Sequence, residues 1–434
     1  MAKNFRQKLS AFCNFALKFD HVAVALIAYA TLYVIIMIAF SVSFLNPLAR
    51  AFDNFRMTDI FYEISNAGGE RDTSDLITIV DMTTVYDRGK LAEMIDQVQD
   101  CKPAVMGIDI VFDGVRNDTI GNERLIETVC STVSPTVWAY KLTNWNSDEG
   151  QFERSFHSFF VDMVDVEHEG FINVQRDTNG GTVRSLGVHR QAEGRTEYSM
   201  SAQVALAATN DSSIVTRSPN CNINYTATYF PVVPSDSITE YADLIRSHVV
   251  LFGAMHDLRD QHYTPIGKIP GVEILAYTVQ TLIDRRMPIE LPLWLTMLVN
   301  FLLVVLVQII QQGVTNLLVK KKSATKQYFG RSGLAKSYIS MAAMVVMIGT
   351  SFLFSYQWNI YLNTTWAIMG IALLYNAREF YGLLIRLFCE KWPLLKQSMY
   401  YVPLEDEKLM PVQSKVSLHG ASIISGDATF TSNC

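Results

Sequence analysis

The chain has 434 residues, of which 49% are hydrophobic and only 18% carry a charge. Soluble domains average about 25% charged residues, so this composition excludes a disordered or fibrous protein and predicts membrane-embedded segments. The net charge of −6 argues against a nucleic-acid partner, because no excess of cations is available to neutralise phosphates. The cysteines form no Cys-x-x-Cys pair, which indicates neither a zinc site nor a disulfide scaffold, and we expect no cofactor.

An uncharged run near the start predicts the first membrane-spanning helix. Residues 22–45 (VAVALIAYATLYVIIMIAFSVSFL) are long enough to cross a bilayer. Lysine and arginine occur in residues 1–21, so the positive-inside rule places that segment in the cytoplasm. The alternative is a cleaved signal peptide, whose apolar core is only about 7–15 residues long and ends at small residues. The following stretch, SFLNPLARAF, offers no such site, and we therefore expect an uncleaved anchor.

Further apolar runs lie in the second half of the chain. They predict transmembrane helices at residues 290–312, 337–356 and 359–377, with a turn near Tyr356–Asn359, since tryptophan and tyrosine favour the membrane interface. The connector at 313–336 is rich in lysine and contains no acid, so we expect a basic cytoplasmic loop that also attracts anionic lipid. Residues 378–434 follow as a cytoplasmic tail. Both termini then lie inside, and residues 46–289 form an outer domain.

The outer domain alternates short β-branched runs with amphipathic segments. The predicted strands are Leu76–Asp81, Ala104–Phe112, Thr136–Tyr140 and Ser247–Ala254, and the predicted helices are Lys90–Gln99, Gly121–Cys130 and Gly271–Asp284. The first strand, helix and strand predict a parallel pair with a right-handed connection. Asn179-Gly180 predicts a hairpin between Gly170–Val174 and Thr182–His189. The expected fold class is an α/β extracytoplasmic domain, with a mixed, largely parallel sheet and flanking helices, plus four transmembrane helices.

Acidic residues gather at the carboxyl ends of the predicted parallel strands. They are Asp81, Asp109, Asp113, Asp257 and Asp260. Because ligands of open α/β sheets bind in the crevice outside those strand ends, the set predicts a polar pocket. Such a pocket suits a cation or a polyhydroxyl ligand, or supports acid–base chemistry. The alternative is that each aspartate only caps a helix or fixes a turn.

The cysteines and histidines of the outer domain leave two questions. Cys101 and Cys130 both fall where consecutive predicted helices end, and an oxidising compartment permits a disulfide between them. Buried free thiols are the alternative. His256 and His262 stand beside aspartates, but their spacing matches no compact ligand motif, so we expect no metal site.

Several motifs occur together in one order. They are ITIVD at Ile77–Asp81, GIDIVF at Gly107–Phe112, GFINVQRDTNGGTVR at Gly170–Arg184 and VVLFGAMHDLRDQHYTPIGKIPGVEILA at Val249–Ala276. With one span before and three after, the chain resembles the type-two CHASE sensory domain, the extracytoplasmic input module of many bacterial signalling proteins. The resemblance covers about residues 45–380 and rests jointly on the acidic strand ends, the D-x-x-x-T-P pattern of Asp260 and Thr264, and the PGVE segment ending at Glu273. It implies a periplasmic domain on a multi-pass protein of the bacterial inner membrane.

The resemblance implies signal reception outside and output inside. After the fourth span we find no kinase, cyclase or phosphoacceptor-histidine motif, so we expect a non-enzymatic receptor subunit that relays an unknown periplasmic ligand to a separate signalling protein. Sensory modules of this kind often dimerise, and a homodimer is an open alternative. The candidate ligand-binding residues are Asp81, Asp109, Asp113, Asp257, Asp260, Thr264 and Glu273.

Two other classes of function remain. A periplasmic hydrolase would use the carboxylates around Asp81 and Asp109 as general acid and base, although no nucleophile motif is present. A transporter would need ionisable groups or broken helices inside the membrane, where the spans offer only Asn300 and a few hydroxyls. For a receptor, the helix Gly271–Asp284 is the expected route of the signal, because it leads almost directly into the second span.

Overall fold

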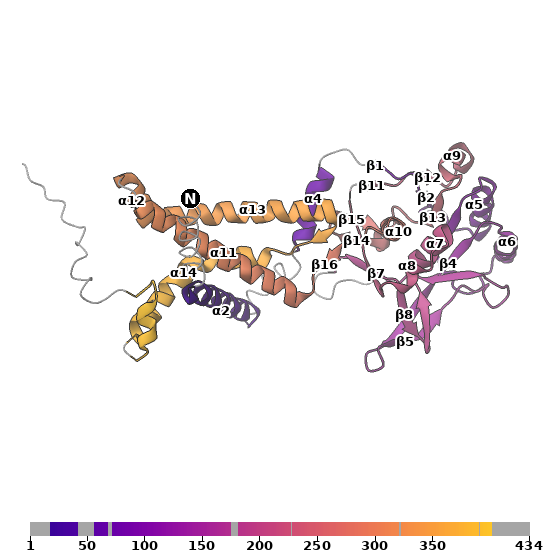
Figure 1. The fold of residues 1–434 in the computed structure, drawn as a ribbon. Helices are drawn as coiled ribbons and strands as arrows, with labels where there is room; N and C mark the ends of the chain where they lie inside the picture. Colours follow the sequence, from indigo (N-terminus) through magenta and orange to yellow (C-terminus); the bar gives the residue numbers. More distant parts are fainter. Residues whose placement is uncertain are drawn as a thin grey trace, which may run out of the picture. The chain divides into compact units, whose positions relative to one another are not determined.

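The computed structural model describes residues 18–41, 56–67, 72–174, 181–226, 228–320, 323–389 and 391–401. They belong to two compact units: Thr31–Ala372 forms one, and the residues up to Ala30 and from Leu373 form the other. The strands, labelled in Figure 1 where there is room, are β1 (Asp72–Thr73), β2 (Ile77–Asp81), β3 (Val105–Ile108), β4 (Thr136–Asn146), β5 (Gln151–Phe156), β6 (His168–Phe171), β7 (Ser185–Gly187), β8 (His189–Ala192), β9 (Arg195–Tyr198), β10 (Asn220–Asn222), β11 (Thr228–Tyr229), β12 (Val232–Pro234), β13 (Val249–Gly253), β14 (Gln261–Thr264), β15 (Gly267–Pro270), β16 (Ile289–Glu290) and β17 (Ile360–Tyr361). The α-helices are α2 (Phe19–Ser41), α4 (Met57–Ala67), α5 (Arg88–Asp100), α6 (Thr119–Ser131), α7 (Met200–Thr209), α8 (Ser213–Thr216), α9 (Ala242–Ile245), α10 (Gly271–Ile283), α11 (Leu293–Val319), α12 (Ala324–Arg331), α13 (Leu334–Trp358) and α14 (Thr365–Phe388), with short 3₁₀ turns η2 (Ile238–Tyr241), η3 (Leu258–Asp260) and η4 (Pro393–Gln397).

A mixed sheet forms the centre of the domain between α2 and α11. In the described residues its strand order is β12–β2–β13–β3–β4–β5–β8–β9, with β6 alongside β4. Every pairing from β12 through β4 is parallel, and so is that of β6 with β4. The strands β5 and β9 add antiparallel pairings to β4 and β8. The mixed, largely parallel sheet expected from the sequence is confirmed.

The first predicted strand–helix–strand unit is present with one strand inserted. The strands β2 and β3 are parallel, as predicted, but β13 lies between them and pairs with both. The strand β3 also ends at Ile108, earlier than the predicted Ala104–Phe112, and Phe112 instead donates its backbone N–H to the Ser158 hydroxyl at 3.1 Å. As a result Asp109 stands directly after the last strand residue.

Side chains of the central strands alternate between two covered faces. In β3, Met106 and Ile108 pack in a core cluster with residues of α5 and α6, whereas Val105 packs in a cluster with residues of α7 and α10. This period of two is the normal consequence of the strand pleat. Both faces are apolar, as parallel sheets with helices on each side require.

The predicted hairpin is wrong in its pairing. The residues Asn179-Gly180 lie outside the described residues, but the strands on either side pair elsewhere. The strand β6 pairs parallel with β4, and β7 pairs antiparallel with β10. The local turn signal therefore does not set the partners, because neighbouring strands of the sheet compete for the same backbone groups.

Among the described residues, four helices are long and apolar enough to cross a membrane: α2, α11, α13 and α14. The turn expected near Tyr356–Asn359 is present, because α13 ends at Trp358 and Asn359 takes the left-handed conformation there. The last helix differs from its prediction. It begins at Thr365 and continues to Phe388, past the charged Arg378 that was expected to end it, and that arginine is buried.

The polar residues of α11 hold the start of α14. The Asn300 side-chain amide donates to the backbone oxygens of Thr296 (2.7 Å) and Asn363 (2.8 Å), and its carbonyl accepts from the Ala367 N–H (2.9 Å). The first backbone N–H groups of a helix have no partner within that helix. Asn300 therefore satisfies groups at the amino end of α14.

The predicted disulfide is not present. Cys101 and Cys130 are both free thiols; Cys101 is buried and Cys130 is exposed. Cys101 belongs to the apolar cluster between α5 and the sheet, whereas Cys130 lies on the solvent side of α6. Both residues end helices, as predicted, but their side chains occupy different surroundings.

We expect Asn300→Leu to destabilise the protein by about 1–2 kcal/mol, because it leaves polar backbone groups of α14 without a partner in an apolar setting. The measurement is thermal unfolding of the full chain in lipid nanodiscs. Asn316→Leu is the matched control, since Asn316 is exposed on the same helix. Equal unfolding temperatures for the two variants would contradict the assigned role of Asn300.

Candidate functional site

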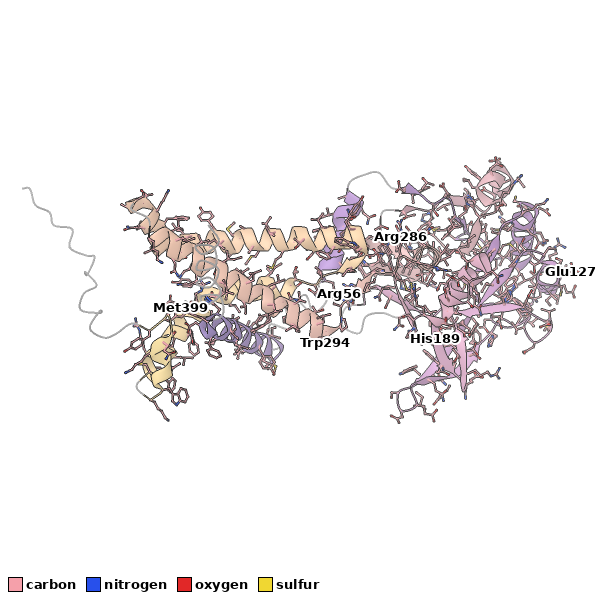
Figure 2. The ribbon with its side chains drawn as sticks, in the orientation of Figure 1. Arg56, Glu127, His189, Arg286, Trp294 and Met399 are labelled. Atoms are coloured by element: carbon pink, nitrogen blue, oxygen red, sulfur yellow. The ribbon has the colours of Figure 1, made fainter. Side chains whose placement is uncertain are left out.

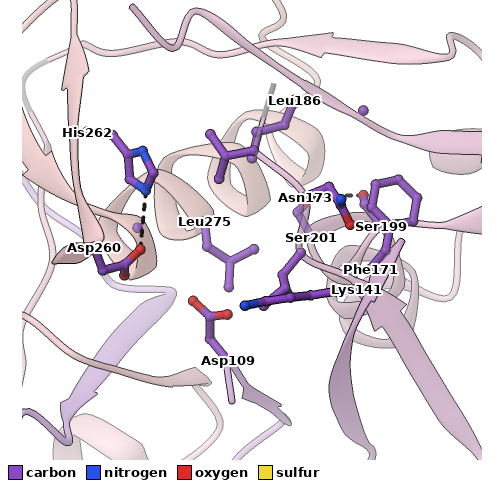
Figure 3. Close-up of a pocket in the computed structure, with 14 residues that line it drawn as sticks. Asp109, Lys141, Phe171, Asn173, Leu186, Ser199, Ser201, Asp260, His262 and Leu275 are labelled. Atoms are coloured by element: carbon purple, nitrogen blue, oxygen red, sulfur yellow. Dashed lines mark hydrogen bonds and ion pairs between the residues drawn. The ribbon is translucent and has the colours of Figure 1, made fainter. Parts of the chain in front are cut away.

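A cavity of about 270 Å³ opens on the α7 and α10 face of the sheet. It lies just below the range of roughly 300–1,000 Å³ that is usual for small-molecule sites. Figure 3 shows charged side chains from separate segments turned toward its centre. The lining residues are Asp109, Lys141, Phe171, Ile172, Asn173, Val174, Leu186, Gly187, Ser199, Ser201, Asp260, His262, Gly271 and Leu275.

Asp109 enters the cavity because of its place in the pleat. It follows β3 in the same alternation as Val105 and Gly107, which face α7 and α10. Its backbone N–H still bonds to the Phe252 carbonyl at 3.0 Å, which fixes the residue at the strand end. Its carboxylate has no hydrogen bond or ion pair with any residue in the described ranges.

The surroundings of Asp109 favour its neutral form. Burial, followed by the negative charge of Asp260, raises the pKa of the Asp109 carboxyl to about 7, although the charges of Lys141 and His262 act in the opposite direction. The Lys141 amine points toward this carboxylate in Figure 3. A carboxyl with a pKa near neutrality in a cavity is a frequent mark of a functional site.

Asp260 and His262 form the opposite wall. The His262 Nε2 atom lies 3.2 Å from an Asp260 carboxylate oxygen, and the histidine side chain is only 10% exposed. Its Nδ1 atom is buried and has no hydrogen-bond partner within the described residues. Asp260 also packs on the start of α10, where a Cβ on Gly271 would lie 2.7 Å from its carboxylate. A side chain at position 271 would therefore push Asp260 away from the cavity.

The amino end of α7 supplies hydroxyls to the third wall. Ser199 caps α7 by accepting the Ala202 N–H, and its hydroxyl lies 3.1 Å from that of Ser201. Both serines are at least 96% buried, at 4% and 2% exposure. The helix can approach this closely because a Cβ on Gly170 would lie 2.4 Å from the Met200 backbone. Glycine at position 170 thus brings the positive end of a helix dipole to the cavity.

The predicted acidic set is only partly assembled. Asp109 and Asp260 line the cavity, but Asp81 does not. The Asp81 carboxylate accepts hydrogen bonds from the N–H and hydroxyl of Thr83 (2.9 and 2.5 Å) and from the Met255 N–H (3.1 Å). Burial raises the pKa of Asp81, but these hydrogen bonds outweigh burial and leave it below its ordinary value. Because β13 separates β2 from β3, the two strand ends do not meet.

Four other candidates lie outside the cavity lining. The Asp257 side chain caps η3 by accepting the Arg259 N–H, and the Asp113 backbone carbonyl accepts a hydrogen bond from Arg88. The Thr264 hydroxyl donates to the Gly267 carbonyl across the β14–β15 turn at 2.8 Å. Glu273 stands in the first turn of α10. Asp81 and Asp257 thus make the loop and capping contacts that the alternative describes, and the Thr264 hydroxyl closes a turn.

Sequence reasoning missed Lys141, Ser199 and Ser201. The alternation of β4 contains a signal for Lys141, since Val137 and Ala139 belong to the same cluster as Val105. No such signal marks the serines, because α7 was not among the predicted helices. Among the described residues, no group of three or more His, Cys, Asp or Glu side chains has the arrangement of a metal site.

A comparison with protein-family models identifies the family of the chain. The family model described as the CHASE2 domain matches residues 31–310, well over half of the chain. The chain belongs to the CHASE2 family. This confirms the resemblance to the type-two CHASE sensory domain, and the whole cavity lies inside the matched part of this CHASE2 protein. No curated protein and no solved structure matches the chain.

We expect the stability of the Asp109→Asn variant of this CHASE2 protein, relative to wild type, to increase from pH 5 to pH 8. The folded-state pKa of Asp109 is raised, so the folded wild type loses stability as pH increases from about 4 to about 7, whereas asparagine does not titrate. The difference between the two proteins should grow by on the order of 2 kcal/mol from pH 5 to pH 8. Thermal unfolding of the full chain at both pH values measures it, and a pH-independent difference would contradict the raised pKa.

We expect Asp81→Asn to have the opposite effect: its stability relative to wild type should be lowest at high pH. The folded-state pKa of Asp81 is lowered, so its stabilisation is present above pH 4 and is lost as pH falls through that folded value. Replacing the ionised carboxylate, which accepts these hydrogen bonds, should lower the free energy of unfolding by about 1–3 kcal/mol at pH 8. The same unfolding series, extended to pH 3, should show the deficit shrinking in acid. A variant as stable as wild type at pH 8 would remove the structural role assigned to Asp81.

Proposed function

We propose that this CHASE2 protein is a bacterial inner-membrane receptor. Its periplasmic domain takes a signal molecule into the cavity around Asp109 and passes the change to a separate partner in the cytoplasm. Support comes from the family, whose domain is a sensory module, and from four helices suited to crossing a membrane. The carrying observation is that α10 lines the cavity and is followed almost at once by α11. In this proposal both termini lie in the cytoplasm, as the positive-inside rule favours.

The helix α10 links the cavity to the membrane segment. Gly271 and Leu275, in its first turns, line the cavity, and the helix ends at Ile283. The apolar helix α11 begins at Leu293 after only the short strand β16. Because α10 is buried along most of its length, it moves as a rigid element. The prolines before α11 interrupt the helix, so a displacement of the α10 end is transmitted rather than a rotation.

The connection after α10 is fastened to the turn between α13 and α14. The strand β16 pairs parallel with β17, so Ile289 stands opposite Ile360. The Ile289 N–H donates to the Asn359 carbonyl at 2.8 Å, and the Asn359 side chain donates to the Arg286 carbonyl at 2.6 Å. A shift of this segment therefore acts on α13 and α14 as well as on α11.

A second connection runs through α4. Arg184 holds Asp59 with two hydrogen bonds, at 3.0 and 2.7 Å, and its side chain is only 10% exposed. The strand β7, which contains the cavity residue Leu186, follows Arg184 directly. The cavity wall is thereby tied to α4 by a bidentate, charge-assisted pair.

The far side of α4 contacts the loop between α13 and α14. The Tyr361 hydroxyl donates to the Tyr62 hydroxyl at 2.9 Å, and Tyr62 donates to the Ile223 carbonyl at 3.2 Å. Phe61 packs against Tyr361 and Phe352. Arg56, labelled in Figure 2, pairs with Glu290 of β16 at 3.1 Å. Two routes from the cavity thus meet at the same short β16–β17 pairing.

The partner is proposed to bind the basic connector between α11 and α13. This connector includes α12, whose Tyr328 is 72% exposed, and it carries Lys320 and Lys326, with Lys336 in the first turn of α13, without a nearby acid in the sequence. Anionic lipid is the other occupant suited to this charge. In the hydrolase alternative, Asp81 and Asp109 would have to act from separate places, because Asp81 makes hydrogen bonds outside the cavity that contains Asp109.

The test measures how a change in the cavity reaches the connector. A photo-crosslinking residue at Tyr328 in the full chain, in native membranes, should capture a signalling protein. We expect Leu275→Trp, which fills the cavity from α10, to change the crosslinked yield at least twofold. Ile120→Trp is the control, because Ile120 is 79% exposed on α6. An unchanged yield with Leu275→Trp would contradict the receptor proposal.

The route is tested with an insertion of Gly-Ser-Gly-Ser between Arg286 and Pro288. We expect this insertion to abolish the effect of Leu275→Trp, because a flexible segment transmits no displacement. The same insertion after Gly150, in the exposed β4–β5 turn, should preserve it. If Leu275→Trp acts equally with both insertions, the route through α10 and β16 is wrong.

A further inference from the structure

The cavity presents one uncompensated group of each charge. Neither the Asp109 carboxylate nor the Lys141 amine makes a hydrogen bond or ion pair with a described residue, and Figure 3 shows the two turned toward each other. The second acid of the cavity, Asp260, is already bonded to His262 at 3.2 Å. Lys141 is exposed and Asp109 is partly buried, so a ligand with a single charge would compensate only one of the two groups. A ligand with both charges would compensate both.

The negative side of the cavity suits an ammonium group. Of the charges that act on Asp109, that of Asp260 has the largest single influence, and it opposes the charges of Lys141 and His262. A primary ammonium donates three hydrogen bonds and relieves the repulsion between the two carboxylates. Buried charges in proteins are stable when they are paired in this way.

The positive side suits a carboxylate. Lys141 supplies a full charge, and the amino end of α7 adds the partial positive charge of a helix dipole. The buried hydroxyls of Ser199 and Ser201 lie at the same helix end and line the cavity. A hydroxyl donates to a carboxylate and cannot compensate its charge, so Lys141 is the required partner.

The rest of the lining is largely hydrocarbon. Phe171, Leu186 and Leu275 face the cavity, and its volume of about 270 Å³ leaves room for only a small ligand. Apolar walls around a few charged groups favour a molecule with a short aliphatic side chain beside its charges.

We propose that the cavity binds a zwitterionic α-amino acid with a small apolar side chain. Its ammonium group pairs with Asp109 beside Asp260, its carboxylate pairs with Lys141 at the amino end of α7, and its side chain packs on Leu186 and Leu275. This inference rests on the proposed function, because it takes the same cavity as the place where the signal is received.

The experiment is equilibrium binding of radiolabelled L-leucine to the full chain in lipid nanodiscs, with L-valine and L-alanine as shorter probes. Competitors that lack one charge separate the two ends: isoamylamine has no carboxylate, and isocaproate has no ammonium. We expect each competitor to bind about 10- to 100-fold more weakly than leucine, the range of a charge-assisted hydrogen bond. Absence of binding by all three amino acids, or a one-charge analogue that matches leucine, would overturn the proposal.

Two substitutions test which charged residue binds the ammonium group of the ligand and which binds its carboxylate. Asp109→Asn should remove the advantage of leucine over isocaproate, and Lys141→Met should remove its advantage over isoamylamine. Asp100→Asn and Lys90→Met are matched controls, because both residues are exposed on α5, and they should leave both ratios unchanged. Ratios unaffected by the cavity substitutions would also overturn the proposal. If a variant fails to fold, the relative affinities of leucine and the one-charge analogues for the wild-type protein still test the proposal.

The two proposals fail separately. If Leu275→Trp alters the Tyr328 crosslink but no amino acid binds, the ligand class is wrong and the receptor function stands. If leucine binds as described but neither leucine nor Leu275→Trp alters the crosslink, the cavity is an amino-acid site and the receptor proposal fails.

Discussion

In β3, alternate side chains point to opposite faces of a sheet that helices cover on both sides. Met106 and Ile108 pack in the core under α5 and α6, so the next residue, Asp109, points to the opposite face of the sheet, toward α7 and α10. The strand ends there, and the carboxylate enters the space at the start of α7 and α10 instead of a packed core. A register shift of one residue would place Asp109 under α5 and α6 and remove it from the cavity.

Close backbone approaches then shape the walls around that carboxylate. Gly170 lets the amino end of α7 lie against β6, and Gly271 leaves room for Asp260 at the start of α10. The two helices consequently present their amino ends, and the hydroxyls of Ser199 and Ser201, to the same small volume. The helix α10 ends at Ile283, and only the short strand β16 separates it from α11, so the element that lines the cavity is close in sequence to an apolar helix long enough to cross a membrane.

Much of this architecture follows from local sequence patterns. Periodicity places β2, β3, α5, α6, β13 and α10 within a few residues of their observed bounds, and uninterrupted apolar runs find the long helices. The errors come from non-local effects. Nothing in the local sequence says that β13, far along the chain, inserts between β2 and β3, and this insertion separates Asp81 from Asp109. The Asn179-Gly180 signal fails for the same reason, because β6 and β7 find partners in β4 and β10. Arg378 does not end α14, and its side chain is buried, which the local sequence does not indicate.

The contrast between Asp81 and Asp109 shows why residue type and strand position alone do not identify a site. Both aspartates stand at the carboxyl end of a parallel strand, and the sequence ranks them equally. Asp81 ends its strand opposite Gly253, and its carboxylate is held by Thr83 and the Met255 N–H, so it closes a loop. Asp109 receives no such donors within the described residues, and burial beside Asp260 disfavours its charge. A fold optimised only for stability would not keep a desolvated carboxyl without a partner. The absence of a described partner for the Asp109 carboxylate, more than its residue type, is what distinguishes it from Asp81.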